Sequence, residues 1–247
     1  MTHKTNGIVL RFVRYGETSI VVSVFTEKFG IQSYIVNGIR TVKGAAKASL
    51  FQPASILQME VYHQSNKNLF RIKDYSRAYS TIQLFENVVK NCVALFMVEL
   101  IYQLLKQPEP NEDLYQFTEA SLLELDKATP AITANLPLFF ALHLTHFLGF
   151  RINYPGKDLL HSDNLFLDLR TGNFTSTQPN HAYFLGKELA QTTAEILQTR
   201  FPADLAAIKL SQAIRRQLLH AYLDFYRFQI PEMGLIKTLK VMEVVFG

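Results

Sequence analysis

The chain has 247 residues, of which 48% are hydrophobic and 19% are charged, with a formal net charge of +4. This length suits one large domain or two smaller ones, and the composition excludes a disordered chain. A single cysteine, Cys92, excludes an internal disulfide and favours a reducing, cytoplasmic setting. The first 12 residues show no signal-peptide pattern.

Charge is distributed unevenly along the sequence. Residues 1–80 contain 11 Lys and Arg against 4 Asp and Glu, whereas residues 81–247 contain 14 against 17. A basic first part joined to a mildly acidic second part predicts a polyanionic partner for the first part.

The first 80 residues are rich in β-branched and aromatic residues that alternate with polar ones. Turn-like segments divide them into five expected strands, at 8–15, 19–26, 31–37, 54–62 and 69–79. Five short strands without a competing helical period predict a small closed barrel of the oligonucleotide-binding (OB) type. The longest connection, residues 38–53, lies between the third and fourth strands.

This connection is a basic loop without acidic residues. No Asp or Glu occurs between Glu27 and Glu60, while Arg40, Lys43 and Lys47 are separated by glycine and alanine. Exposed cations of this kind neutralise phosphates and release counterions, and phosphate contacts position a strand without reading its sequence. The loop is therefore predicted to bind nucleic acid.

The fifth strand is the second candidate nucleic-acid surface. A period of two predicts one face that carries Arg71, Lys73, Tyr75 and Arg77, the opposite face carrying Phe70, Ile72 and Asp74. Cations around a tyrosine can hold phosphates while a base stacks, although a solvated outer face gives the same alternation. Two arginines of the first strand belong to the same candidate set: Arg11 and Arg14.

From Thr81 the hydrophobic period becomes helical. Helices are expected at 81–107, 111–125, 130–147, 186–199, 205–229 and 235–246. Residues 151–185 are turn-rich and are interpreted as an insertion with a hairpin around DLRTGNF. The uncharged stretch 128–150 is long enough to cross a bilayer, but its prolines, histidines and helical spacing favour a buried core helix and no membrane partner.

Enzyme motifs are absent from the sequence. His143 and His146 are three residues apart without an acidic third ligand nearby, and His161, Asp163 and His181 lack the thiolates that structural zinc prefers. No nucleophile elbow or phosphate-binding loop is present, and Cys92 lies on an apolar helical stripe. We therefore expect a protein without catalytic residues, metal or cofactor.

Arg215 and Arg216 are adjacent in the expected helix 205–229, at the border of its apolar stripe. Two interpretations remain open for this pair. The arginines could form salt bridges with the acidic part of the chain, or they could extend the basic surface of the barrel.

Three short segments mark a resemblance to a known family: YGE after the first strand, FTEKFG between the second and third strands, and LFQP after the basic loop. With the closing segment RRQLLHAYLDFYRFQIPEMGLIKTLKVMEVV, the chain resembles the bacterial RecO family over nearly its whole length. The resemblance implies an OB barrel (1–80) and a helical domain (81–247), hence an α+β multidomain fold with the insertion 151–185. It also implies sequence-independent binding of single- and double-stranded DNA, annealing of complementary strands, and help in loading recombinase.

The resemblance also implies partners: RecR, and single-stranded DNA-binding protein through its acidic C-terminal tail. Many members carry a four-cysteine zinc module where this chain has residues 151–185, but this segment contains no cysteine, so a zinc role is not carried over. Apolar residues could hold the module's shape instead: Leu165, Phe166, Leu167, Phe174, Tyr183 and Phe184. The alternative function is a protein-interaction adaptor whose basic barrel binds an acidic protein tail rather than DNA.

Overall fold

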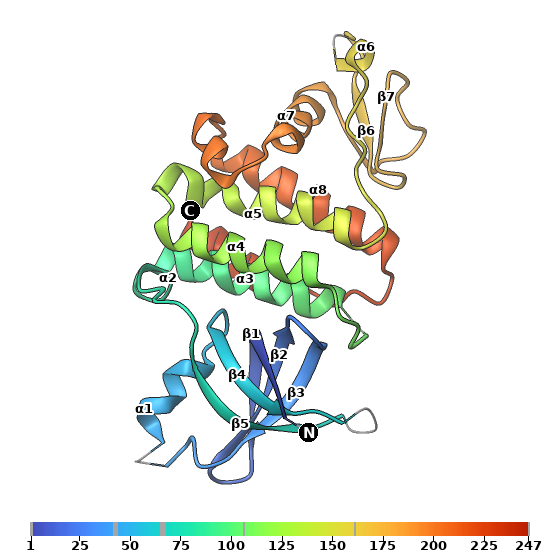
Figure 1. The fold of residues 1–247 in the computed structure, drawn as a ribbon. Coiled ribbons are helices and arrows are strands. Elements are labelled where there is room, and N and C mark those ends of the chain that lie inside the picture. The colour runs from blue at the N-terminus through green and yellow to red at the C-terminus, as the bar shows by residue number, and fades with distance from the viewer. Residues whose placement is uncertain (1, 42–43, 65–67, 106, 161, 247) are drawn as a thin grey trace. The chain divides into compact units, whose positions relative to one another are not determined.

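Five strands in the first part of the chain close into a barrel (Figure 1). The computed structural model describes residues 2–41, 44–64, 68–105, 107–160 and 162–246. The strands are β1 (Thr2–Tyr15), β2 (Ser19–Thr26), β3 (Gly30–Val36), β4 (Ile56–Tyr62) and β5 (Phe70–Arg77). Their order is β1-β2-β3-β5-β4, with a parallel β3–β5 pair and antiparallel pairs elsewhere. The predicted five-stranded barrel is confirmed, and β1 begins six residues earlier than expected at Thr2.

Alternating apolar residues of all five strands fill the barrel interior. Val9, Val22 and Leu57 are completely buried there, and the connection between β3 and β4 adds Phe51, which is 1% exposed. This connection contains a short helix, α1 (Ala45–Ala48), followed by a 3₁₀ turn, η1 (Ser49–Phe51). The basic loop is therefore anchored to the barrel through an apolar side chain at its end.

A bulge in β5 changes which residues share a face. The register pairs Glu60 with Asp74 and Val61 with Ile72, so Lys73 is an extra residue without a partner opposite it. Because side chains alternate with a period of two, one extra residue moves every later residue to the other face. The prediction of one face with Arg71, Lys73, Tyr75 and Arg77 is therefore wrong.

Three helices follow the barrel: α2 (Gln83–Glu86), α3 (Val88–Leu104) and α4 (Glu112–Lys127). The single helix expected at 81–107 is interrupted at Asn87, whose backbone is extended and whose side chain accepts hydrogen bonds from the backbone of Val89 and Lys90. Asn87 thus caps α3 and ends α2. Cys92 in α3 is 4% exposed, and burial raises the pKa of its thiol.

The barrel and these helices belong to one compact unit, residues 1–126, and residues 127–247 form a second unit. On the outer surface of the barrel the register places Ile8 beside Ile56 and Phe25, all three of them nearly or fully buried. The Phe25 ring lies 5.6 Å from the ring of Tyr115 in α4. The barrel therefore shares apolar contacts with a helix that lies beyond residue 80. The domain boundary at residue 80 stays a prediction.

The second unit contains α5 (Pro130–Leu144), α7 (Lys187–Gln198), α8 (Gln212–Gln229) and α9 (Thr238–Val245), with 3₁₀ turns η2 (Thr145–Phe147) and η3 (Pro202–Ala207). Helix α5 packs against α7, α8 and η3, and the Tyr226 hydroxyl of α8 donates to the Ala141 carbonyl at 2.7 Å. The expected helix 205–229 begins only at Gln212, because Ser211 caps it by accepting from the backbone N–H of Ile214. No helix within the described ranges is long and apolar enough to cross a membrane.

The segment between α5 and α7 forms a small sheet with strands β6 (Phe166–Asp168), β7 (Asn173–Thr175) and β8 (Phe184–Leu185), preceded by the short helix α6 (Lys157–Leu160). The order β7-β6-β8 confirms the hairpin around DLRTGNF. Leu165 and Leu167 are fully buried, Phe174 is 8% exposed, and Phe166 packs edge-on against Phe184. Tyr183 is 44% exposed and contributes less than expected.

Candidate nucleic-acid interface

The start of the basic loop is fastened to the turn between β1 and β2. The Arg40 guanidinium donates to the Gly16 carbonyl at 3.1 Å, and the Arg40 backbone N–H donates to the Thr18 carbonyl at 3.0 Å. Gly16 has a φ of 58°, a left-handed conformation that glycine adopts without strain. These bonds bring Arg40 to the end of the barrel where Arg14 emerges from β1.

Arg14, Arg40 and Lys47 are all exposed. Within the described part of the chain, no carboxylate lies within ion-pair distance of any of them. Glu17 in the same turn is exposed too and lowers the positive charge locally. Lys43, the third cation predicted for the loop, lies outside the described residues. The unpaired cations remain available to a polyanion.

The three cations of β5 that were predicted to bind nucleic acid, Lys73, Arg77 and Arg71, have different surroundings. Lys73 forms an ion pair with Glu60 at 2.8 Å, and this hydrogen bond raises the pKa of Lys73 and lowers that of Glu60. The guanidinium of Arg77 lies 5.9 Å from the ring centroid of Phe85 in α2. Arg71 lies beside Tyr62 on the outer face of the sheet, and within the described residues neither Arg71 nor Arg77 forms an ion pair with a carboxylate.

Tyr75 faces the barrel interior. It pairs with the buried Met59, and its ring packs edge-on against Phe51 at 4.8 Å. Burial, followed by the charge of Asp74, raises the pKa of its hydroxyl. The predicted base-stacking position of Tyr75 is therefore wrong, because the bulge at Lys73 moves this residue to the inner face.

Arg11 contacts α3 through a cation–π interaction. Its guanidinium carbon lies 4.7 Å from the ring centroid of Tyr102, and the side chain stays exposed. Three exposed aromatic residues that the sequence analysis missed lie on the described barrel strands: Phe12 is 46% exposed, Tyr15 is 54% exposed and Tyr62 is 47% exposed. The outward alternation of Gln58, Glu60 and Tyr62 in β4 is the sequence signal that could have identified Tyr62.

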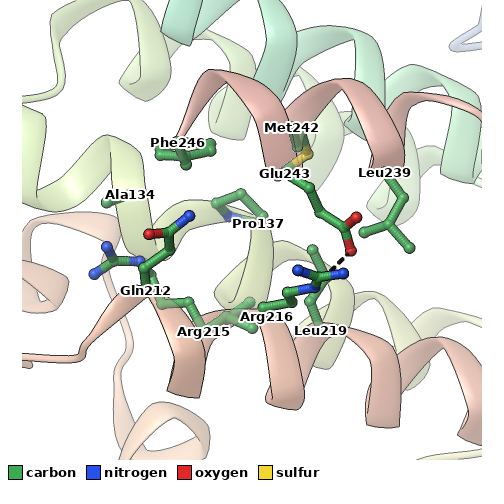
Figure 2. A pocket seen from close by; sticks show the side chains of 11 residues that line it. Ala134, Pro137, Gln212, Arg215, Arg216, Leu219, Leu239, Met242, Glu243 and Phe246 are labelled. Carbon is green, nitrogen blue, oxygen red and sulfur yellow. Dashed lines mark ion pairs between the residues drawn. The ribbon is translucent and has the colours of Figure 1, made fainter.

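Arg215 and Arg216 line a pocket between α5, α8 and α9 (Figure 2). Arg216 Nε lies 2.9 Å from Glu243 Oε1, and His220 Nε2 lies 2.8 Å from the same oxygen. Arg215 donates to the Leu210 carbonyl at 2.6 Å, and burial lowers the pKa of its guanidinium. Of the two interpretations, the salt bridge is present for Arg216. Apolar side chains form most of the remaining lining: Ala134, Pro137, Leu138, Leu219, Leu239, Met242 and Phe246.

The histidines considered as metal ligands contact a backbone carbonyl or a single carboxylate. His143 Nε2 lies 3.2 Å from the Ile196 carbonyl, and burial lowers the pKa of this imidazole. His181 lies 3.4 Å from Asp168, and His161 is outside the described residues. Among the described residues there is no group of three or more His, Cys, Asp or Glu side chains that could hold a metal ion.

A closed five-stranded barrel with unpaired surface cations, followed by helices, defines a protein of the OB-fold class. The sequence family described as "Recombination protein O N terminal" matches residues 1–80, and "Recombination protein O C terminal" matches residues 86–154. DNA repair protein RecO of Phocaeicola vulgatus is 30% identical and that of Bacteroides fragilis 29% identical, both over the whole of each chain. DNA repair protein RecO of Porphyromonas gingivalis is 28% identical over 98% of each chain. The chain belongs to the RecO family, which places it among proteins of DNA repair and recombination.

Proposed function

We propose that this protein is a non-catalytic recombination mediator that binds single- and double-stranded DNA without sequence preference. In this function it anneals complementary strands and helps to load recombinase onto strands coated by single-stranded DNA-binding protein, in the cytoplasm, with RecR as a partner. The observation that carries the proposal is the group of exposed cations without an ion-pair partner among the described residues: Arg14 and Arg40 at one end of the barrel, and Lys47 in the connection between β3 and β4. Membership of the RecO family supports it independently.

The chemistry of these cations fits contacts with the DNA backbone. Guanidinium and ammonium groups neutralise phosphates and release condensed counterions, which gives affinity without reading bases. Arg40 is held by its bonds to the β1–β2 turn, so its position is fixed before DNA arrives. A mediator that anneals any complementary pair requires binding of this kind.

The test is the salt dependence of binding to random-sequence single strands. Replacing Arg14, Arg40 and Lys47 by Ala should weaken binding to every sequence equally and reduce the slope of log K against log salt by about 2, from about 0.7 per contact. A matched control replaces three exposed cations of the second unit, Lys157, Arg200 and Lys209, and so removes the same charge. Equal slopes for the two triple variants would show that net charge alone, and not this site, binds DNA.

A protein-interaction adaptor is the second candidate function, and the pocket in Figure 2 favours it. Its apolar lining, with Arg215 and Arg216 beside Glu243, suits an acidic peptide that also carries apolar side chains, and the acidic tail of single-stranded DNA-binding protein is the candidate. A fluorescent peptide with this tail should bind the wild-type protein and bind an Arg216→Gln variant more weakly. Peptide binding by a protein that shows no affinity for random oligonucleotides at low salt would favour the adaptor alone.

A further inference from the structure

An open groove in the second unit lies between α7, the turn η3 and the start of α8. One wall is acidic, because Glu188 and Glu195 of α7 are exposed and lie about two helical turns apart on the same side of the helix. Within the described residues neither of them forms an ion pair. Asp204 and Lys209 also line the groove, so three carboxylates against one ammonium leave an excess of negative charge.

The opposite wall is apolar. Ile208, Leu210 and Ile214 line it, and each of them is only half-buried. Hydrogen bonds from the neighbouring helices hold this wall in place: the side-chain amide of Asn135 donates to the Ile208 carbonyl at 2.7 Å, and Arg215 donates to the Leu210 carbonyl at 2.6 Å. A groove with one acidic and one apolar wall suits a helix that presents a cation beside apolar side chains.

Helix α9 presents an outward face of this composition. Its buried side carries Leu239 and Met242, which line the pocket in Figure 2. On the other side Lys240, Val241 and Val244 lie within an arc of about 100° around the helix axis. Val241 is 52% exposed and Val244 is 80% exposed, and within the described residues Lys240 forms no ion pair.

The outward face of α9 cannot reach the groove of its own chain. The helix packs by its buried side against α5 and α8, which turns Val241 and Val244 away from the unit. The second unit thus carries two complementary surfaces that its own described residues leave uncovered. The cation of one matches the carboxylates of the other, and the valines match the apolar wall.

We infer that the outward face of α9 of one copy of this protein docks in the groove of a second copy. Lys240 then lies beside Glu188 and Glu195, and Val241 and Val244 cover the apolar wall. Because helix and groove belong to the same unit, two copies can bind each other reciprocally, and the contact then occurs twice in one dimer.

The contact adds a property to the proposed function without sharing its residues. A dimer carries the cations Arg14, Arg40 and Lys47 twice, and with the proposed DNA binding it would hold two strands at a high effective concentration. The contact itself uses none of these cations. Self-association and DNA binding can therefore fail separately.

The experiment measures the mass of the full-length protein by sedimentation over a range of concentrations. At low salt the mass of the wild-type protein should rise above that of the monomer, and high salt should weaken the association because exposed charge pairs are screened. Lys240→Glu and Glu195→Lys should each raise the dissociation constant at least about tenfold, since each brings like charges together. The matched variants Lys157→Glu and Asp158→Lys alter exposed charges of the same unit outside the contact and should associate like the wild type.

A mixture of the two contact variants tests the pairing of the surfaces. The Lys240→Glu protein keeps an intact groove, and the Glu195→Lys protein keeps an intact helix face. The mixture should therefore associate although each variant alone stays monomeric. A mixture that stays monomeric would contradict the docking of α9 in this groove.

Carbodiimide crosslinking of the unaltered protein gives a test that does not depend on the folding of any variant. The reagent joins a lysine amine to a contacting carboxylate as an amide and takes up the water that is lost. In a mixture of protein with ordinary and heavy nitrogen, crosslinked peptides should join Lys240 to Glu188 or Glu195 and should combine both isotopes.

Three results would overturn the contact: a wild-type protein that stays monomeric at low salt up to its solubility limit, contact variants with the wild-type dissociation constant, or crosslinks confined to other peptides. None of them would alter the salt slope of DNA binding, so the proposed function would stand. A protein that associates as expected but binds no DNA would overturn the proposed function and leave the contact standing.

Discussion

Residues 1–80 should not fold stably without the helices that follow them. The outer surface of the barrel carries the buried row Ile56, Ile8 and Phe25, and the ring of Phe25 lies against Tyr115 of α4. The backbone of Gly30 also comes close to that of Glu109, so a Cβ on Gly30 would lie 2.3 Å from the Glu109 carbonyl oxygen. Cutting the chain after residue 80 removes these partners.

The size of the effect follows from the side chains that become exposed. Fully exposing a large aliphatic or aromatic side chain costs about 1.5–3 kcal/mol, so the three residues of the row together cost about 5–9 kcal/mol. Folded domains are stable by only about 5–15 kcal/mol. The loss is therefore comparable with the whole stability of an 80-residue barrel.

The assay compares a fragment of residues 1–80 with a fragment of residues 1–127. Circular dichroism during urea titration suits both, because the sequence contains no tryptophan for fluorescence. The longer fragment should unfold in one cooperative transition, and hydrogen exchange should show protected amides in β1 and β2. The shorter fragment should show neither feature.

A cooperative transition of the 1–80 fragment, with a midpoint within about 1 M urea of the longer fragment, would refute this reasoning. It would mean that the apolar row is covered within the barrel itself. The same result would support the domain boundary at residue 80.

Three further predictions concern single residues. Tyr226→Phe should cost about 1–3 kcal/mol of unfolding free energy, because the buried Ala141 carbonyl loses its donor; an unchanged urea midpoint would contradict this. Gly30→Ala should lower the unfolding free energy by about 2 kcal/mol or more, and with it the melting temperature, because φ at this position is 63° and the new Cβ would meet the backbone of Glu109. A melting temperature within about a degree of the wild-type value would exclude this strain. The hydrogen bond with His220 and the nearby positive charge hold the pKa of Glu243 below its ordinary value of 4.5. A lowered folded-state pKa gives stability that is complete above the ordinary value and lost as pH falls through the folded-state pKa, so Glu243→Gln should flatten the acid limb of a melting-temperature profile. Parallel acid limbs for the two proteins would count against this pairing.

The sequence was sufficient for the barrel because its signal is local. Alternation and turn residues determine each strand, and five strands of this length have few ways to close. The bulge at Lys73 could not be predicted in this way, since it depends on which residue of β4 lies opposite. Because of this one extra residue, Tyr75 faces the barrel interior and not the outer surface on which base stacking was predicted.

In the helical part of the chain, the hydrophobic pattern also fails to predict where helices begin and end. The apolar stripe runs through Asn87 without a break, yet its side chain caps α3 and its extended backbone ends α2. Similarly, the periodicity of residues 205–229 does not reveal that Ser211 starts α8. Arg216 was predicted only as one of two alternatives, because its partner Glu243 is 27 residues away and comes close only through the packing of α9.

The burial of Cys92 has a practical consequence for measuring the protein in solution. As the sole cysteine, 4% exposed and with its thiol pKa raised by burial, it presents little thiolate to a labelling reagent. A second cysteine placed at Val13 would then react far faster and carry a single fluorophore. Such a site-specifically labelled protein would report directly how far a strand end lies from the outer surface of the barrel.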